Sequence, residues 1–441
     1  MKKLVTLLAA AGMVMAASAP ASAVDVKVDA RYRTSFKTGE TGFTGANQEA
    51  VTQRLRLGLT MAASENLSAY ANFQFGTEHW GTSDDTNGMK GSIQTRMLYL
   101  DWKVPGTPVK VRMGRQNLGL PADAFGHNAV MAAGWGTRDG IVVTSPVTDW
   151  LGVTGLWARL GSNGNTVSDL DQNMSNDFFG LAANLKFNGI SGSVYGAYAA
   201  IDGEIAQAKR IANFGAKNGL NFEATRGNAW WIGGTATLSY FDPFTLKLSA
   251  AYGSYESSES LADQKETAGW NVQAKASYKT AFGTPVLGAW YFSGYDKDGD
   301  GLMPTMTGYF TPTRTWNDAA KGLNGGQGFG TPTGNWGVQL GVEGVSFLQG
   351  LSHDFLVSYI EGTNDKDVDM SVVEKQDMWL TEEDSLVEFD FISTYQIYKN
   401  LAAHLELSYI VSDIEDRGTG ATATKLSEDD WRAELTFEFK F

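Results

Sequence analysis

Arginine is the residue type best able to do chemistry in this sequence, and it is unevenly distributed along the chain. Seven of the fourteen arginines lie between residues 31 and 115: Arg31, Arg33, Arg54, Arg56, Arg96, Arg112 and Arg115. A guanidinium group stays charged and donates hydrogen bonds in a planar fork that fits carboxylates. Rings of such groups select anions in narrow channels, because they raise the local anion concentration. The cluster predicts a basic surface that favours small anions, unless acids such as Asp25, Asp29 and Asp101 pair with it.

The segment DKDGDG at residues 296–301 has the residue types of a cation site. Asp296, Asp298 and Asp300 stand at alternate positions and a glycine follows them. Oxygen ligands alternate in this way at the start of a Ca²⁺-binding loop, where the glycine permits a tight turn. The position of the usual closing glutamate holds Thr307 instead. The motif therefore predicts either a Ca²⁺ that orders a loop or an acidic surface turn without metal.

Residues for catalysis are scarce. The chain has no cysteine, which excludes thiolate nucleophiles and metal–thiolate sites. Its four histidines are His79, His127, His353 and His404, and none of them lies in a motif with a nucleophile. We therefore expect no enzyme, and no cofactor apart from the Ca²⁺ considered above.

The elements that must carry these side chains are β-strands, because apolar and polar residues alternate over long stretches. The clearest alternating segments are 25–36, 54–61, 270–279, 387–391, 401–411 and 431–441. In the last segment Trp431, Leu435 and Phe441 share one parity, while charged residues take the other. Period two is typical of strands with one apolar and one polar face. The sequence therefore predicts an all-β protein.

Short and long connections alternate between these strands. The short ones lie at 64–66, 104–108, 145–149, 187–189, 241–243, 282–285, 347–350 and 397–400. The long ones lie at about 38–49, 76–91, 116–138, 161–176, 202–228, 257–268, 297–334, 363–384 and 413–429. Eight hairpins and one strand at each end make about eighteen strands, although sixteen also fits these loose strand bounds.

Long strands with short turns at one end and long loops at the other are typical of a transmembrane antiparallel up-and-down β-barrel. Hydrocarbon offers no hydrogen-bond partner, so the sheet must close and the strand at 431–441 must pair with the first strand. The alternative is a soluble sandwich or jelly roll with a dry core. Tryptophans near strand ends favour the barrel, as an interfacial girdle: Trp102, Trp150, Trp230, Trp231, Trp270, Trp336 and Trp431.

Residues 1–23 have the composition of a secretory signal peptide. Two lysines precede the apolar run 4–17, and Ala21-Ser22-Ala23 forms a cleavage site. We expect export through the periplasm and one outer-membrane barrel made by residues 24–441. The formal net charge of −14 argues against nucleic acid as a partner, because phosphate binding needs clustered basic residues.

Two motifs are similar to those of trimeric general porins of Gram-negative outer membranes. They are FEFKF at 437–441 and VRMGRQNLGL at 111–120. The closest resemblance is to the homotrimeric porin family of sulfate-reducing bacteria. It implies a homotrimer among lipid and lipopolysaccharide, inserted by the barrel-assembly machinery, that passes small hydrophilic solutes and ions by passive diffusion. A substrate-specific channel is the alternative, and it would need aromatic residues along the lumen.

The resemblance also implies a constriction. The segment at about 117–137 would be the third extracellular loop, folded into the barrel. Strand parity places Arg31, Arg33, Arg54, Arg56 and Arg112 in the lumen. Arg115 has lipid-facing parity, but a bend at Gly114 would turn it into the constriction, as the resemblance implies. Arg96 also has the wrong parity and would need a bulge. The loop offers only Asp123 in its middle as an opposing acid.

Overall fold

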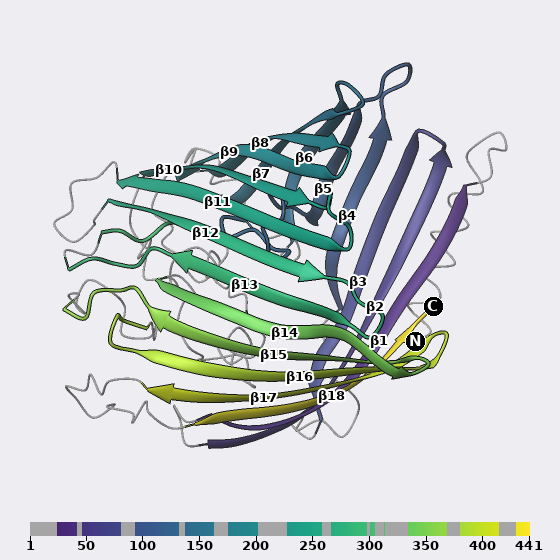
Figure 1. Ribbon diagram of the computed structural model, residues 1–441. Coiled ribbons are helices and arrows are strands. Elements are labelled where there is room, and N and C mark those ends of the chain that lie inside the picture. The colour runs from purple at the N-terminus through teal and green to yellow at the C-terminus, as the bar shows by residue number, and fades with distance from the viewer. Residues whose placement is uncertain are drawn as a thin grey trace.

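The computed structural model describes residues 24–41, 46–80, 93–131, 137–162, 175–201, 227–257, 266–297, 300–304, 313, 334–367, 380–413 and 429–441. These residues form one antiparallel sheet of 18 strands, and β1 pairs with β18, so the sheet closes into a barrel (Figure 1). The predicted all-β barrel is therefore confirmed, with the larger of the two strand counts. Among the described residues, no helix is long and apolar enough to cross a membrane.

The strands follow one another around the barrel in chain order. They are β1 (Asp25–Thr41), β2 (Ala46–Ser64), β3 (Leu67–His79), β4 (Ile93–Lys103), β5 (Lys110–Asn117), β6 (Thr137–Pro146), β7 (Leu151–Ser162), β8 (Ser175–Phe187), β9 (Ile190–Ile201), β10 (Gly227–Leu238), β11 (Phe244–Ser257), β12 (Thr267–Tyr278), β13 (Thr284–Phe292), β14 (Asn335–Leu348), β15 (Leu351–Gly362), β16 (Ser385–Tyr398), β17 (Leu401–Asp413) and β18 (Asp430–Lys440). All eight predicted short turns join strands at one end of the barrel (Figure 1).

The closing seam between β18 and β1 runs to the last residue. The Phe441 amide donates to the Ala30 carbonyl at 3.1 Å, and the Ala30 amide donates to the Phe441 carbonyl at 3.0 Å. Above this point ten residue pairs continue the ladder, from Arg31–Lys440 to Glu40–Trp431. The seam thus leaves no open strand edge in the membrane, where unpaired backbone groups would be costly.

The first extracellular connection is shorter than the sequence indicated. A loop was expected at about 38–49, but β1 continues to Thr41 and β2 begins at Ala46. Residues on both faces of this hairpin end are polar, so the period-two signal fades there. Strands that extend beyond the membrane meet water on both faces, and their pairing then needs no apolar stripe.

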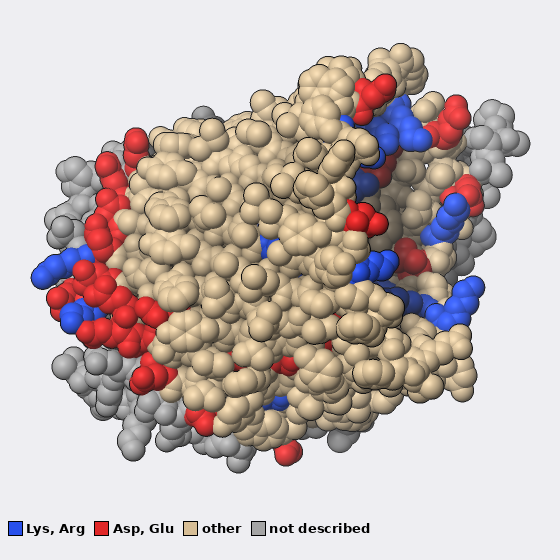
Figure 2. All heavy atoms as spheres, in the orientation of Figure 1, with Lys and Arg blue, Asp and Glu red and all other residues tan. Residues whose placement is uncertain are grey.

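The outer face carries an apolar belt. Tan atoms cover the middle of the face in Figure 2, and acidic atoms collect at one end of it, on the side of the long loops. Within the belt, Trp150 stacks on Phe187 with ring centroids 5.6 Å apart. Trp231 is an exception to the predicted girdle. It is buried and its Nε1 donates to the Pro304 carbonyl at 2.7 Å, because adjacent strand residues point to opposite faces and Trp230 takes the outer one.

Candidate functional site

The third long loop crosses the inside of the barrel, as predicted. This loop, L3, joins β5 to β6, and residues 118–131 of it are described. Leu118, Val130 and Met131 are buried in an apolar cluster with side chains of the barrel wall. The wall members of that cluster come from β7 to β11 and from β13, β15, β16 and β17: Leu156, Ala158, Phe178, Ala182, Tyr195, Ala197, Ala199, Ala229, Trp231, Ala251, Tyr255, Trp290, Phe292, Ile360, Leu386 and Ile410. L3 therefore belongs to an apolar cluster that spans a large part of the inner wall and that also contains Met303 and Leu380 from other connections.

The tip of L3 is fastened to the wall opposite β5. The Ala124 amide donates to Ser249 Oγ on β11 at 3.1 Å. Phe125 packs edge-on against Trp290 of β13, with centroids 5.7 Å apart. The Phe125 ring occupies the space left by Gly288, where a Cβ would lie 2.8 Å from the Phe125 Cζ. The loop is thus seated by a ring that fits a glycine gap.

Asp123, the predicted constriction acid, is used to fold L3. Its Oδ1 accepts hydrogen bonds from the Phe125 amide at 3.0 Å and the His127 amide at 3.1 Å. Its Oδ2 accepts from Gln273 Nε2 of β12 at 3.2 Å. The hydrogen bonds favour the ionised form and lower the pKa of Asp123, but burial has the larger effect and raises this pKa to about 6. The carboxylate therefore holds the loop and is not an exposed pole facing the arginines.

The strands on the other side of the lumen carry the basic residues. Arg31 and Arg33 of β1 lie beside Arg56 and Arg54 of β2 in register. Their apolar neighbours Tyr32 and Phe36 are exposed on the outer face, so these four arginines face inward. Arg33 and Lys440 form ion pairs with Glu438 of β18, and Arg31 Nε lies 3.9 Å from the same carboxylate.

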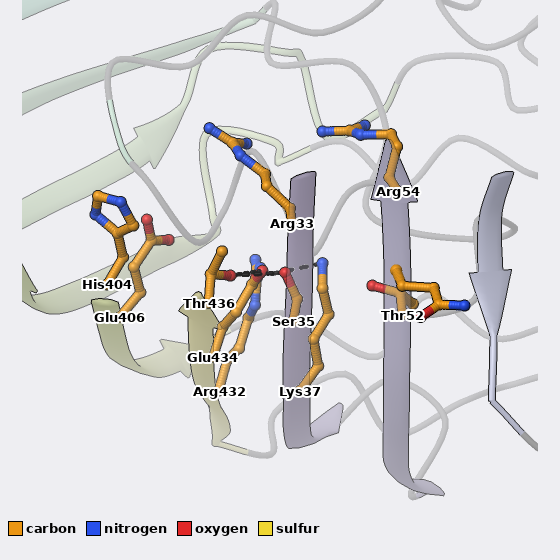
Figure 3. Close-up of a pocket in the computed structure, with 11 residues that line it drawn as sticks. Arg33, Ser35, Lys37, Thr52, Arg54, His404, Glu406, Arg432, Glu434 and Thr436 are labelled. Atoms are coloured by element: carbon orange, nitrogen blue, oxygen red, sulfur yellow. Dashed lines mark hydrogen bonds and ion pairs between the residues drawn. The ribbon is translucent and has the colours of Figure 1, made fainter. Parts of the chain in front are cut away.

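A second carboxylate, Glu434, continues this inner surface along β18. It pairs with Arg432 and, at 3.2 Å, with Lys37 Nζ. The Ser35 and Thr436 hydroxyls lie 2.6 Å apart between the two acidic positions. Figure 3 shows Arg33 and Arg54 reaching into the same space from β1 and β2. Together with residues of β17, these side chains line a cavity of about 330 Å³.

Among the described residues, the inner arginines Arg54, Arg56 and Arg96 of β2 and β4 differ from Arg31, Arg33 and Arg112 in their partners. Within the described part of the chain, Arg54, Arg56 and Arg96 form no ion pair, and Arg56 Nε donates to Gln74 Oε1 at 2.9 Å. Arg96 interacts electrostatically with Arg54 and Arg56 and so lies on the same wall. The bulge that its parity required is present, because the β3–β4 register shifts between the Asn72–Met97 and Phe73–Thr95 pairs.

Arg112 and Arg115 differ in their placement. Arg112 faces inward and makes a bidentate ion pair with Asp101, at 2.6 and 2.8 Å. Arg115 stays in register opposite Leu98 and Asp139, on the outer face. Its Nη1 donates to Asp139 Oδ2 at 2.9 Å. The expected inward turn of Arg115 is wrong. Gly114 has a φ of +121°, yet the ladder continues through it without a bulge.

The aspartates of the predicted Ca²⁺ loop act as turn-forming residues where they are described. Asp296 Oδ1 accepts from the Asp300 amide at 2.8 Å, and Asp300 Oδ1 accepts from the Gly301 and Ala268 amides. Asp298 lies outside the described residues. The described residues include no group of three or more acidic or histidine side chains placed to hold a metal ion. The Ca²⁺ site stays a prediction.

Two groups of inner residues were not predicted as part of the site. Glu434 and Glu438 lie on β18, far from the arginines in sequence, so only the seam brings them together. Tyr70 and Tyr99 face the lumen from β3 and β4. Their polar parity was visible in the sequence, but their alignment depends on the strand register, which the sequence pattern leaves open.

Comparison with known proteins places these features in a family. Residues 4–301 match the family model described as Gram-negative porin. No curated protein sequence matches the chain. Among solved structures, OpdL of Pseudomonas aeruginosa is similar at 16% identity and a TM-score of 0.56, covering 95% of this chain and 99% of that chain.

Two further Pseudomonas aeruginosa structures have the same coverage of this chain, 95%, and cover 98% of their own. OccK2 (OpdF) is 13% identical with a TM-score of 0.59, and OpdK, solved with vanillate, is 11% identical with a TM-score of 0.57. At such identities the likeness shows the barrel fold. Because the family model covers about two thirds of the sequence, the chain belongs to the Gram-negative porin family, whose barrels lie in the outer membrane.

Proposed function

We propose that this barrel is a water-filled channel for passive diffusion of small hydrophilic solutes and ions, with a preference for anions. The observation that carries the proposal is the wall of inner arginines Arg54, Arg56 and Arg96, which form no ion pair with any carboxylate in the part of the chain that the structure describes. L3 packs apolar residues against much of the remaining wall, so solutes pass beside these arginines. Unpaired guanidinium groups in a narrow lumen raise the local concentration of anions.

The test is the reversal potential of the purified barrel in a planar bilayer under a KCl gradient. We expect chloride preference at neutral pH, and we expect the double variant Arg54→Gln/Arg56→Gln to lose most of it. The control is Arg115→Gln, which removes one positive charge from the outer face. A cation preference of the unaltered protein, or an equal loss of preference in the control, would contradict the proposal.

A substrate-specific channel is the second candidate. OpdK and OccK2 were solved with vanillate and with glucuronate, which are both carboxylates. The inner arginines of this chain have the chemistry to bind a carboxylate. Saturable block of single-channel current by a carboxylate would favour this candidate. Flux that depends only on solute size would favour the general channel.

We infer further that the barrel assembles as a homotrimer, as the resemblance to trimeric porins implies. A row of outward ion pairs supports a protein contact on β5 to β8, namely Arg115–Asp139 at 2.9 Å and Arg159–Asp177 at 2.7 Å. An arginine on the lipid face costs about 2–4 kcal/mol at mid-depth and less toward the interfaces, and a protein neighbour would avoid that cost. Mass measurement in detergent tests this, with Arg115→Ala/Arg159→Ala expected to weaken the trimer.

The remaining expectations stay predictions. They are cleavage of a signal peptide after residue 23, contact with lipopolysaccharide, insertion by the barrel-assembly machinery, a Ca²⁺ near residues 296–300 and the lack of enzymatic activity. Each has a direct check: N-terminal sequencing, lipid analysis of the purified barrel, assembly in a depleted strain, calcium titration and hydrolase assays.

A further inference from the structure

Two tyrosines form an aromatic pair on the inner wall, between the arginines and the short-turn end of the barrel. Tyr70 of β3 and Tyr99 of β4 are direct cross-strand partners. Their ring centroids lie 5.3 Å apart with the planes tilted by 38°. Both side chains are partly exposed, although they face the lumen and not the membrane. A solute that has passed Arg54 and Arg56 therefore meets these rings next.

The neighbouring residues hold the two rings in place. Arg112 lies over the Tyr99 ring, with its Cζ 4.1 Å from the ring centroid, while its guanidinium is fixed by Asp101. Asn72 Nδ2 donates to the Tyr70 hydroxyl at 3.3 Å. A cation stacked on one ring and a hydrogen bond to the other limit their rotation. The pair is thus an ordered surface and not two mobile side chains.

Asp29 of β1 reaches toward the pair across β2, at the one position of this stretch where β2 has a glycine. Gly58 is the register partner of both Asn72 and Asp29. A Cβ at Gly58 would lie 2.3 Å from Asp29 Oδ1, so the Asp29 carboxylate occupies the space that a side chain would take. This arrangement places a hydrogen-bond acceptor in the electrostatic neighbourhood of both tyrosines.

A cation, Arg96, completes the arrangement. Arg96 interacts electrostatically with Tyr70 and forms no ion pair among the described residues. It lies on β4, three residues before Tyr99, at the bulge that turns it into the lumen. One continuous stretch of wall therefore offers a guanidinium group, then two aromatic rings, and then a carboxylate.

We propose that Tyr70, Tyr99 and Arg96 form a binding subsite for a solute that carries both a ring and a carboxylate. The carboxylate pairs with Arg96, and one face of the ring lies on the tyrosines. Flat aromatic rings and the apolar faces of pyranose sugars both fit this chemistry. Hydroxyl groups of a sugar can also donate to Asp29. The inference rests on the proposed channel function and adds the class of solute to it.

Block of KCl conductance in planar bilayers tests the subsite with three sodium salts of one negative charge each. Glucuronate carries a pyranose ring, benzoate carries an aromatic ring, and gluconate is an open chain. An aromatic contact is worth about 0.5–1.5 kcal/mol, so we expect half-block by a ring compound at a concentration about twofold to tenfold below that of gluconate. Tyr70→Leu/Tyr99→Leu should remove this difference and leave block by gluconate unchanged.

Two controls separate loss of the rings from loss of the fold. Tyr70→Phe/Tyr99→Phe keeps both rings and should keep the preference for ring compounds. Tyr252→Leu removes a tyrosine from the outer face and should also keep it. Equal block by all three salts in the unaltered protein, or a preference that survives the double Leu change, overturns the subsite alone. Absence of any KCl conductance overturns the channel function as well.

Discussion

Asp123 is a single carboxyl group on which the seating of L3 depends. It is 8% exposed, and its partners are two amides of its own loop and Gln273 on the opposite wall. Its folded pKa of about 6 lies above the ordinary value of 3.8. The folded state therefore binds the proton more tightly than the unfolded chain does. The resulting stabilisation is full below pH 4 and is lost as the pH rises through 6.

We predict that Asp123→Asn removes this pH dependence. The asparagine keeps an acceptor for the loop amides, and Gln273 Oε1, which has no partner, can accept from the new amide after a flip. In the unaltered barrel the change from pH 4 to pH 7 should cost about 3 kcal/mol at most. The check is the temperature at which the barrel unfolds at each pH, read from the change in its gel mobility after heating. If the unfolding temperature of the variant changed between pH 4 and pH 7 by as much as that of the unaltered barrel, the prediction would be contradicted.

Arg96 and Arg115 show what strand parity predicts at the scale of the residue. Parity placed Arg31, Arg33, Arg54, Arg56 and Arg112 on the inner face, where the structure has them. Parity alone sends Arg96 and Arg115 outward. The bulge beside Phe73 reverses the first, and Arg115 keeps its outer position because Asp139 pairs with it. A bulge depends on the partner strand, so a single strand's pattern does not predict it.

At the scale of the element, L3 is the part that crosses the inside of the barrel. Phe125 anchors it in the gap at Gly288. The sequence predicted the inward fold of L3 through the resemblance carried by residues 111–120. The seat at Gly288 was not predictable, because a glycine in β13 and a phenylalanine 163 positions earlier show no relation until the barrel closes.

We predict that Gly288→Leu unseats L3 and raises single-channel conductance. A leucine side chain would enter the volume of the Phe125 ring, where even a Cβ comes within 2.8 Å. Overpacking of this kind costs about 1–3 kcal/mol, which we expect to displace the Phe125 end of the loop. Gly155→Ala is the matched control, since a Cβ there meets nothing within 4 Å. Unchanged conductance in Gly288→Leu would show that L3 does not set the constriction.

At the scale of the whole molecule, acidic and basic side chains lie in different places. The chain is acidic overall, and acidic atoms gather at the long-loop end of the outer surface (Figure 2). The inner wall at the seam is basic, and Glu438 is the carboxylate that joins Arg31, Arg33 and Lys440 there. Salt and solvent screen the exposed acidic groups, so their charge has little effect on the electrostatic potential at the basic inner wall.

We predict that Glu438→Gln has two effects at once. Three cations lose their carboxylate across the β1–β18 seam, so the barrel should be less stable by about 1–3 kcal/mol, since the cations are partly hydrated. Removal of one negative charge from the wall should also raise anion preference in reversal-potential measurements. Glu382→Gln, an exposed acid outside the barrel lumen, should do neither. Lower stability with unchanged selectivity would show that Glu438 stabilises the seam but does not lie on the permeation path, and would contradict the second effect.

The packing of L3 against the wall from β7 to β13 leaves the passage off-centre. In the proposed channel, a solute would therefore travel beside the strands near the seam, on the side of the lumen away from L3. The two halves of the barrel then have different requirements. In the half near the seam the charge of the inner side chains matters, and in the other half their volume matters, because L3 packs against it. Substitutions in the second half should alter how firmly the gateway holds its shape, while those in the first should alter what goes through it.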